Sequence, residues 1–134
     1  MVAPVPAGEA FSPGQAATVE KAIAAAETQG RLSFSVYVGP LTGDPRARAL
    51  ALHAGASADP ARLVLLALDL TAKRLEIVTG VAAHEALDDR SCALAALTMT
   101  SALSAGDLVG SIVDGLGALA EHARHPKVLH TDQP

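Results

Sequence analysis

The sequence predicts a single α/β domain in which a small mixed sheet is covered by helices. Three observations lead to this prediction: apolar alternation over 32–38, a continuous apolar run over 63–68, and helical apolar spacing before, between and after these segments. The chain has 134 residues, half of them apolar, so it is long enough to form one hydrophobic core. We expect one domain over 12–123, a flexible lead over 1–11 and a flexible tail over 124–134.

Two helices are predicted ahead of the apolar run, each from a capping residue followed by proline. Ser12-Pro13 begins the first helix, and Gly30 ends it. Asp44-Pro45 begins the second helix, which we expect to continue through Ala54.

Three strands are predicted. Over 32–38 apolar residues alternate with polar ones, which indicates a strand with one buried face. The run over 63–68 indicates a strand covered on both faces, and the alternating segment 74–79 follows it closely enough to form a hairpin. Because a helix joins the first two strands, we expect them to pair in parallel and the sheet to be mixed.

Two further helices are predicted after Gly80. Asp88 can cap a helix over 89–104 that is apolar nearly all round, and we interpret it as buried in the domain. Asp107 can cap the last helix, which contains Gly110, Gly115 and Gly117. Each glycine costs roughly 1 kcal/mol relative to alanine, and close contact with the preceding helix or the sheet would offset that cost.

Charge and composition exclude several classes of function. The formal net charge is −4, and the aromatic residues are Phe11, Phe34 and Tyr37 alone, so we expect no nucleic-acid binding. The longest uncharged stretch, 91–106, is shorter than the ~20 residues of a spanning helix, so we expect no membrane-spanning segment. Cys92 is the single cysteine and is interpreted as a buried structural thiol. Since no internal disulfide can form, the fold does not depend on an oxidising compartment. Residues 1–10 contain no Lys or Arg and so do not resemble a secretory signal, and with no spanning segment we expect a cytoplasmic protein.

Motifs of known catalytic and metal sites do not occur. The glycines of the last helix lack the Gly-Lys-Ser/Thr ending of a phosphate-binding loop, and no nucleophile elbow, His-Glu-x-x-His or cysteine-rich zinc spacing is present. His122 and His125, with His130 beyond, could share a metal, but histidines near a helix C-terminus are usually solvated and interact with its dipole. His53 and His84 are expected in surface helix or loop. We assign no catalytic residue and no cofactor on this basis.

Four carboxylates are candidates for a metal site: Asp69, Asp88, Asp89 and Asp107. Asp69 ends the apolar strand and the other three lie at helix starts, where their oxygens could bind a hard cation such as Ca²⁺ or Mg²⁺. Each acid also has a simpler explanation, because aspartate is favoured in turns and as a helix cap. The residues alone favour turns and caps, with the metal site as the alternative.

The order of these segments resembles the TPM domain. Over residues 63–122 the matching features are an apolar strand ending in Asp69, then Arg74-Leu75-Glu76-Ile77, Gly80, Leu87-Asp88-Asp89, a helix, Gly106-Asp107 and a glycine-bearing last helix. More narrowly, three segments are similar to DUF5130, a family of actinobacterial proteins of unknown function: residues 34–40, 76–80 and 105–110. The similarity to DUF5130 covers roughly residues 9–123.

This resemblance implies a three-layer α-β-α sandwich with a mixed sheet of about four strands, TPM-like. A fourth strand would lie at an edge, at Thr42 or around Val81. Some TPM-like proteins have been described as acid phosphatases or Ca²⁺ binders, and others as partner-binding modules of membrane or envelope proteins. The acids that match the family's acidic positions are Asp69, Asp88 and Asp107, with Asp89 adjacent.

The sequence departs from the TPM pattern in two places. The segment Thr79-Gly80-Val81 lacks the aromatic residue of the usual Gly-aromatic-Gly turn, and the membrane helix that often follows a TPM domain is missing. Both differences argue against transferring metal binding, catalysis or membrane attachment.

Two functions follow as hypotheses. The first is a non-catalytic module that binds or regulates a protein partner through the loops at the strand ends, because no nucleophile–base pair is evident. The alternative is a divalent-metal-dependent phosphatase, or a Ca²⁺-binding domain without catalysis, that uses the acids at the family's acidic positions. A phosphate ester would need nearby cations, for which Lys73, Arg74 and Arg90 are the candidates. A homo-oligomer formed through the last helix stays open.

Overall fold

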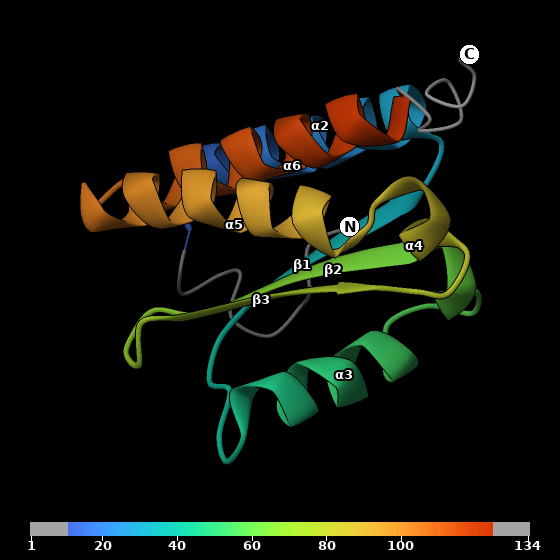
Figure 1. Ribbon diagram of the computed structural model, residues 1–134. Coiled ribbons are helices and arrows are strands. Elements are labelled where there is room, and N and C mark those ends of the chain that lie inside the picture. Colours follow the sequence, from blue (N-terminus) through green and yellow to red (C-terminus); the bar gives the residue numbers. More distant parts are fainter. Residues whose placement is uncertain (1–10, 125–134) are drawn as a thin grey trace.

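The computed structural model describes residues 11–124. Its helical segments are α2 (Pro13–Gly30), α3 (Pro45–Gly55), the 3-10 turn η1 (Pro60–Arg62), α4 (Ala83–Ala86), α5 (Asp89–Ser104) and α6 (Leu108–Arg124). Its strands are β1 (Ser33–Val38), β2 (Leu63–Asp69) and β3 (Arg74–Thr79). The predicted helices and strands are all present in the predicted order, with η1 and the short α4 in addition (Figure 1).

The described strands form one mixed sheet in the order β1-β2-β3. β1 and β2 run parallel, with Ser33 opposite Leu63, while β2 and β3 are antiparallel, with Asp69 opposite Arg74. Figure 1 shows α2, α5 and α6 on one side of this sheet and α3 on the other. The predicted three-layer α-β-α sandwich and the parallel pairing of the first two strands are therefore confirmed.

We expected a fourth strand at Thr42 or around Val81, and this prediction is wrong. Within residues 11–124, neither position lies in a strand. Thr42 lies in the irregular connection before α3, and Val81 lies in a turn with 81% of its surface exposed. The chain leaves the sheet after β3 because Gly80 lies against η1, so closely that a Cβ there would overlap the Pro60 carbonyl oxygen. The backbone then turns into α4.

β1 is buried on both faces, so the prediction of a single buried face is wrong. Phe34 and Val36 belong to the core between the sheet and the α2–α6 layer. Ser35 and Tyr37 point to the α3 side and are buried as well. These positions, which alternate with the apolar ones in the sequence, are buried because α3 packs over that face of the sheet. The Tyr37 hydroxyl donates to Pro40 O at 3.0 Å.

The predicted helix caps are formed by the expected side chains. Ser12 makes a capping box with Gln15 at the start of α2. A carboxylate accepts a backbone N–H of the first turn in three other helices, from Asp44 in α3, Asp88 in α5 and Asp107 in α6. These caps fix where the long helices begin.

α5 is not buried all round, contrary to the prediction. Ser91, Ala95 and Met99 face inward and are buried, while Leu94 and Leu97 are 45% and 66% exposed. α6 lies between α2 and α5, so α5 is the outer helix of its layer and only one of its faces meets the domain (Figure 1).

The expected flexible lead and tail lie almost entirely outside the described residues. Phe11 is described, and its side chain is buried in the core, so the core takes in the last residue of the expected lead. Within residues 11–124, no helix is long and apolar enough to cross a membrane.

Candidate functional site

A pocket of about 580 Å³ lies at the carboxyl end of β2. It lies between the β2–β3 turn and the α5–α6 turn, which Figure 1 shows at the same end of the molecule. We call it the hairpin pocket; its lining residues are Asp69, Leu70, Lys73, Arg74, Thr100, Leu103, Ser104, Gly106 and Leu108. Small-molecule sites in α/β sheets commonly occupy this position and enclose roughly 300–1,000 Å³.

Two cations reach the hairpin pocket from the β2–β3 turn. Lys73 has a left-handed backbone (φ 58°), and Arg74 begins β3 opposite Asp69. Both side chains are exposed, and neither makes a hydrogen bond or ion pair with any described residue. Their positive charges are therefore free to meet an anionic group.

The Asp69 carboxylate joins two loops at the edge of the pocket. Its Oδ2 accepts the Leu41 N–H at 2.9 Å, and its Oδ1 accepts the Ala72 N–H at 3.1 Å. The N–H of Leu41, followed by that of Ala72, lowers the pKa of Asp69 against the opposing effect of burial, with a further contribution from Thr71. The carboxylate is ionised at neutral pH and links the β1–α3 loop to the β2–β3 turn.

The helices supply the opposite wall of the pocket. The Thr100 hydroxyl donates to Ala96 O at 2.8 Å, so its oxygen keeps acceptor capacity only, whereas the Ser104 hydroxyl makes no hydrogen bond with a described residue. Gly106 follows α5 in a left-handed conformation (φ 83°), and the Asp107 carboxylate then accepts the Gly110 N–H at 2.8 Å to cap α6. This tight turn places α6 beside the pocket.

The structure does not bring the four candidate acids together. Asp69 lies in the pocket, and Asp107 lies beside it in the α5–α6 turn without lining it. Asp88 and Asp89 lie at the other end of α5, whose 16 residues span about 24 Å. Asp88 Oδ1 accepts both the N–H and the hydroxyl of Ser91 at 2.9 Å. One ion cannot bind acids at both ends of this helix.

The described residues contain no group of three or more His, Cys, Asp or Glu side chains arranged to hold a metal. Arg90, in the first turn of α5, lies away from the hairpin pocket. His122 is half-buried in the last turn of α6, and His125 and His130 fall outside the described residues. Ca²⁺ or Mg²⁺ binding at Asp69 or Asp107 stays a prediction.

His53 is buried, contrary to the surface position expected. It lies near the end of α3, and its Nε2 donates to Leu63 O at 2.8 Å. The same carbonyl accepts the Gly80 N–H at 2.9 Å, so both interactions meet at the start of β2. The spacing of four residues from buried Ala49 is the signal that could have placed His53 on the inner face of α3.

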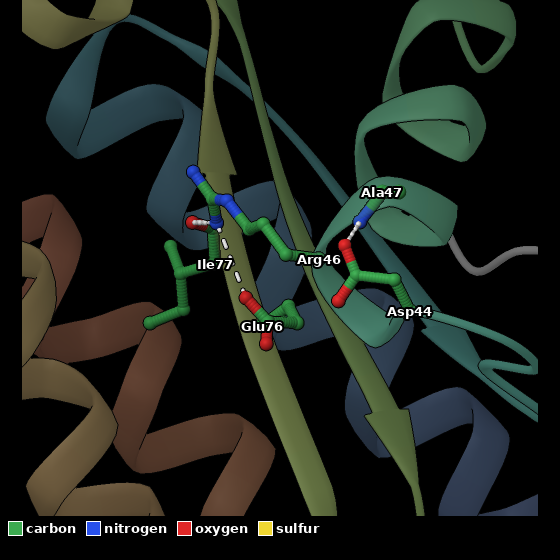
Figure 2. Close-up of polar contacts among 5 residues, drawn as sticks. All are labelled: Asp44, Arg46, Ala47, Glu76 and Ile77. Atoms are coloured by element: carbon green, nitrogen blue, oxygen red, sulfur yellow. Dashed lines mark hydrogen bonds and ion pairs between the residues drawn. The ribbon is translucent and has the colours of Figure 1, made fainter.

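A second polar cluster joins α3 to the edge strand β3 (Figure 2). Arg46 Nη1 donates to Ile77 O at 2.9 Å and lies 3.3 Å from Glu76 Oε1. Asp44 caps the same helix through the Ala47 N–H at 3.2 Å. The cluster is structural, because Asp44 caps the start of α3 and Arg46 binds a carbonyl of the edge strand.

Cys92 is half-buried. Burial raises the pKa of its thiol to about 11, and the charges of Asp89 and Asp88 add to the effect. The thiol is protonated at neutral pH, as expected for a structural cysteine.

The cations of the pocket were predicted from the sequence, but its helical wall was not. Thr100, Ser104, Gly106 and Leu108 follow the β2–β3 turn by about 30 residues, and only the antiparallel return of α5 along the sheet brings them close. The glycine at position 106, directly before the capping Asp107, was the available signal, since a glycine after a helix predicts a sharp turn.

Solved structures with a similar fold come from several bacteria. The BA42 protein of the psychrophilic bacterium Bizionia argentinensis is similar with a TM-score of 0.77 at 15% identity, over 84% of this chain and 81% of that one. The N-terminal domain of the cg2496 protein of Corynebacterium glutamicum gives a TM-score of 0.68 at 18% identity, over 86% and 74%. The N-terminal domain of a P. gingivalis protein gives 0.68 at 19% identity, over 84% and 75%. These likenesses establish the fold alone.

Among curated proteins, none matches the sequence. The family described as a domain of unknown function, DUF5130, matches residues 3–120. That range includes every element from α2 to α5 and most of α6. The chain therefore belongs to the DUF5130 family.

Proposed function

We propose that this domain binds an acidic segment of a protein partner in the hairpin pocket and does not catalyse a reaction. The observation that carries the proposal is the pair of unpartnered cations, Lys73 and Arg74, beside a partly apolar pocket. Carboxylates of the partner would form charge-assisted hydrogen bonds with these cations. The aliphatic part of the segment would contact Leu70, Leu103 and Leu108.

The chemistry of the pocket favours binding over catalysis. Its lining contains no histidine or cysteine, and the Thr100 hydroxyl donates to the backbone of its own helix. Both carboxylate oxygens of Asp69 accept backbone N–H groups. A catalytic nucleophile needs a base within hydrogen-bond reach, and these polar groups serve the fold instead.

The proposal is tested by amide NMR of the full chain during titration with a hexaglutamate peptide, and in parallel with inorganic phosphate. We expect saturable shifts of the Lys73, Arg74, Ser104 and Gly106 amides with the peptide. Phosphate alone should produce smaller shifts at the same amides, because it lacks the aliphatic contacts.

A matched pair of variants gives the control. Lys73→Gln with Arg74→Gln should abolish the shifts, whereas Lys21→Gln with Arg48→Gln removes the same charge from exposed positions outside the pocket and should leave them unchanged. Equal loss in both double variants would indicate diffuse charge attraction and would overturn the proposal.

The alternative is a divalent-metal-dependent phosphatase or a Ca²⁺-binding domain, which the ionised Asp69 beside the pocket supports. Titration with Ca²⁺ and then Mg²⁺ separates it from the first proposal. Two results together would overturn the partner-binding proposal in favour of the phosphatase. They are saturable shifts at Asp69 and Asp107, and chelator-sensitive hydrolysis of p-nitrophenyl phosphate that Asp107→Asn abolishes. Shifts without hydrolysis would identify a Ca²⁺ or Mg²⁺ site.

We further propose that residues 12–123 fold as a single domain, that DUF5130 is an actinobacterial branch of TPM-like proteins, and that this protein is cytoplasmic. The single continuous core of the α2–α6 layer supports the first point. The order of matching strand, turn and cap segments supports the second. The single cysteine, which leaves the fold independent of an internal disulfide, supports the third.

A further inference from the structure

We propose that the outward face of α5 is the contact surface for a second copy of this chain, with the two α5 helices packed antiparallel about Leu97. This α5 face consists of Arg90, Ala93, Leu94, Leu97, Ser101 and Ser104, which recur at intervals of three and four residues and therefore lie on one side of the helix.

The α5 face is unusually apolar for an exposed helix surface. Leu97 is 66% and Leu94 is 45% exposed, and both are among the few large apolar side chains exposed in residues 11–124. No charged residue occurs over 91–106. A surface helix normally presents charged residues to water, and an exposed apolar surface of this kind is typical of contact sites.

The spacing of side chains suits a copy of the same helix. Counting outward from Leu97, Ala93 and Ser101 lie four residues away on either side, and Arg90 and Ser104 lie seven away. In an antiparallel pair each residue opposes the one equally far on the other side of Leu97. The small Ala93 and Ser101 would flank the Leu97 of the second copy and allow the helices to approach closely.

Charge complementarity supports the antiparallel arrangement. Arg90 lies in the first turn of α5, where its charge is unfavourable to the dipole of its own helix, and it makes no hydrogen bond or ion pair with a described residue. In the proposed pair it reaches the last turn of the α5 helix of the second copy, near Ser104. That turn carries the negative end of the helix dipole, which favours a cation, so Arg90 gains a favourable partner there.

Sedimentation equilibrium of the full chain, over concentrations up to about 0.5 mM, measures the association. We expect a monomer–dimer equilibrium, and Leu97→Asp should weaken dimerisation at least about 100-fold, because it places a charge at the centre of the contact. Leu50→Asp is the matched control: Leu50 is 48% exposed on α3, on the opposite side of the sheet, and its change should leave the dimer intact.

Cross-linking tests the symmetry separately. In a Cys92→Ser background, Leu97→Cys should oxidise to a disulfide-linked dimer much faster than Leu50→Cys, because only a residue at the symmetry axis meets its own copy. Arg90→Glu should weaken the dimer without affecting folding, as checked by circular dichroism. A monomer at every concentration, a dimer unaffected by Leu97→Asp, or equal cross-linking at the two cysteine positions would overturn the proposal. Binding of a different apolar helix without self-association would also overturn it.

Discussion

Gly115 of α6 lies directly against the side chain of Met99 of α5: a Cβ built on Gly115 would lie 2.7 Å from Met99 Cγ. Both residues are buried, and the contact lies on the faces where α5 and α6 pack together. The close approach offsets the roughly 1 kcal/mol by which glycine disfavours a helix. Gly117, two residues later, is exposed and has open space where a Cβ would lie.

These two glycines make a matched pair for a stability test. Gly115→Ala should lower the free energy of unfolding by about 1–3 kcal/mol, because the added methyl overpacks the contact with Met99. Gly117→Ala should raise it by about 0.5–1 kcal/mol through helix propensity. Urea unfolding followed by circular dichroism measures both. Stabilisation by Gly115→Ala would contradict the packing described.

Asp69→Asn should destabilise the fold by about 1 kcal/mol at neutral pH, because an amide offers one acceptor oxygen to the N–H groups of Leu41 and Ala72. The folded-state pKa of Asp69 lies below the ordinary value of roughly 3.9. Its stabilisation is therefore complete above the ordinary pKa and is lost as pH falls through the folded-state pKa.

The gap in unfolding free energy between the unmodified chain and Asp69→Asn should accordingly narrow in acid. Urea unfolding at a series of pH values from neutral to below 3 follows it. Asp114→Asn, which changes an exposed carboxylate without a hydrogen bond to a described residue, is the control and should have little effect at any pH. A gap that stays constant down to the lowest pH would argue against the bridging role of the carboxylate.

Arg46→Met should cost more stability than Glu76→Gln. Arg46 donates to the Ile77 carbonyl of the edge strand, a bond worth about 1 kcal/mol, and only Arg46→Met removes it (Figure 2). The ion pair with Glu76 is half-exposed on the Arg46 side and contributes roughly 0.2–1 kcal/mol. Urea unfolding at low and high salt separates the ion pair from the hydrogen bond. High salt should reduce the loss of unfolding free energy caused by Glu76→Gln and leave most of the loss caused by Arg46→Met.

Cys92 should react slowly with alkylating reagents while the chain is folded. With a pKa of about 11 its thiolate fraction at pH 8 is on the order of 100-fold smaller than that of an ordinary cysteine thiol. Iodoacetamide labelling followed by mass spectrometry measures the rate, with Leu50→Cys as an exposed reference in the same chain. Equal rates at the two positions would contradict the raised pKa.

The helix starts and the order of the strands along the chain were predictable because they depend on local chemistry. Ser12, Asp44, Asp88 and Asp107 each bind backbone N–H groups within three residues of themselves, so the sequence near each cap is sufficient. The apolar run over 63–68 must be covered on both faces wherever it lies.

The predictions that were wrong concern which faces of the strands and helices are buried. Burial depends on residues far away in the chain. Ser35, Tyr37 and His53 look polar in sequence but are buried, because α3 folds back over the sheet. Leu94 and Leu97 look like core residues but are exposed, because α6 occupies the position between α5 and α2.

By itself, the sequence determined that this chain forms an α/β domain with a mixed sheet, where its helices begin, and that it lacks the common catalytic motifs. Only the tertiary structure decided that the unpartnered Lys73 and Arg74 share a pocket with Ser104 and the α5–α6 turn, and that Asp88 lies far from Asp69. The physical reason is that caps and periodicity are read within a few residues, whereas a pocket is formed by segments that meet only after the helices have packed on the sheet.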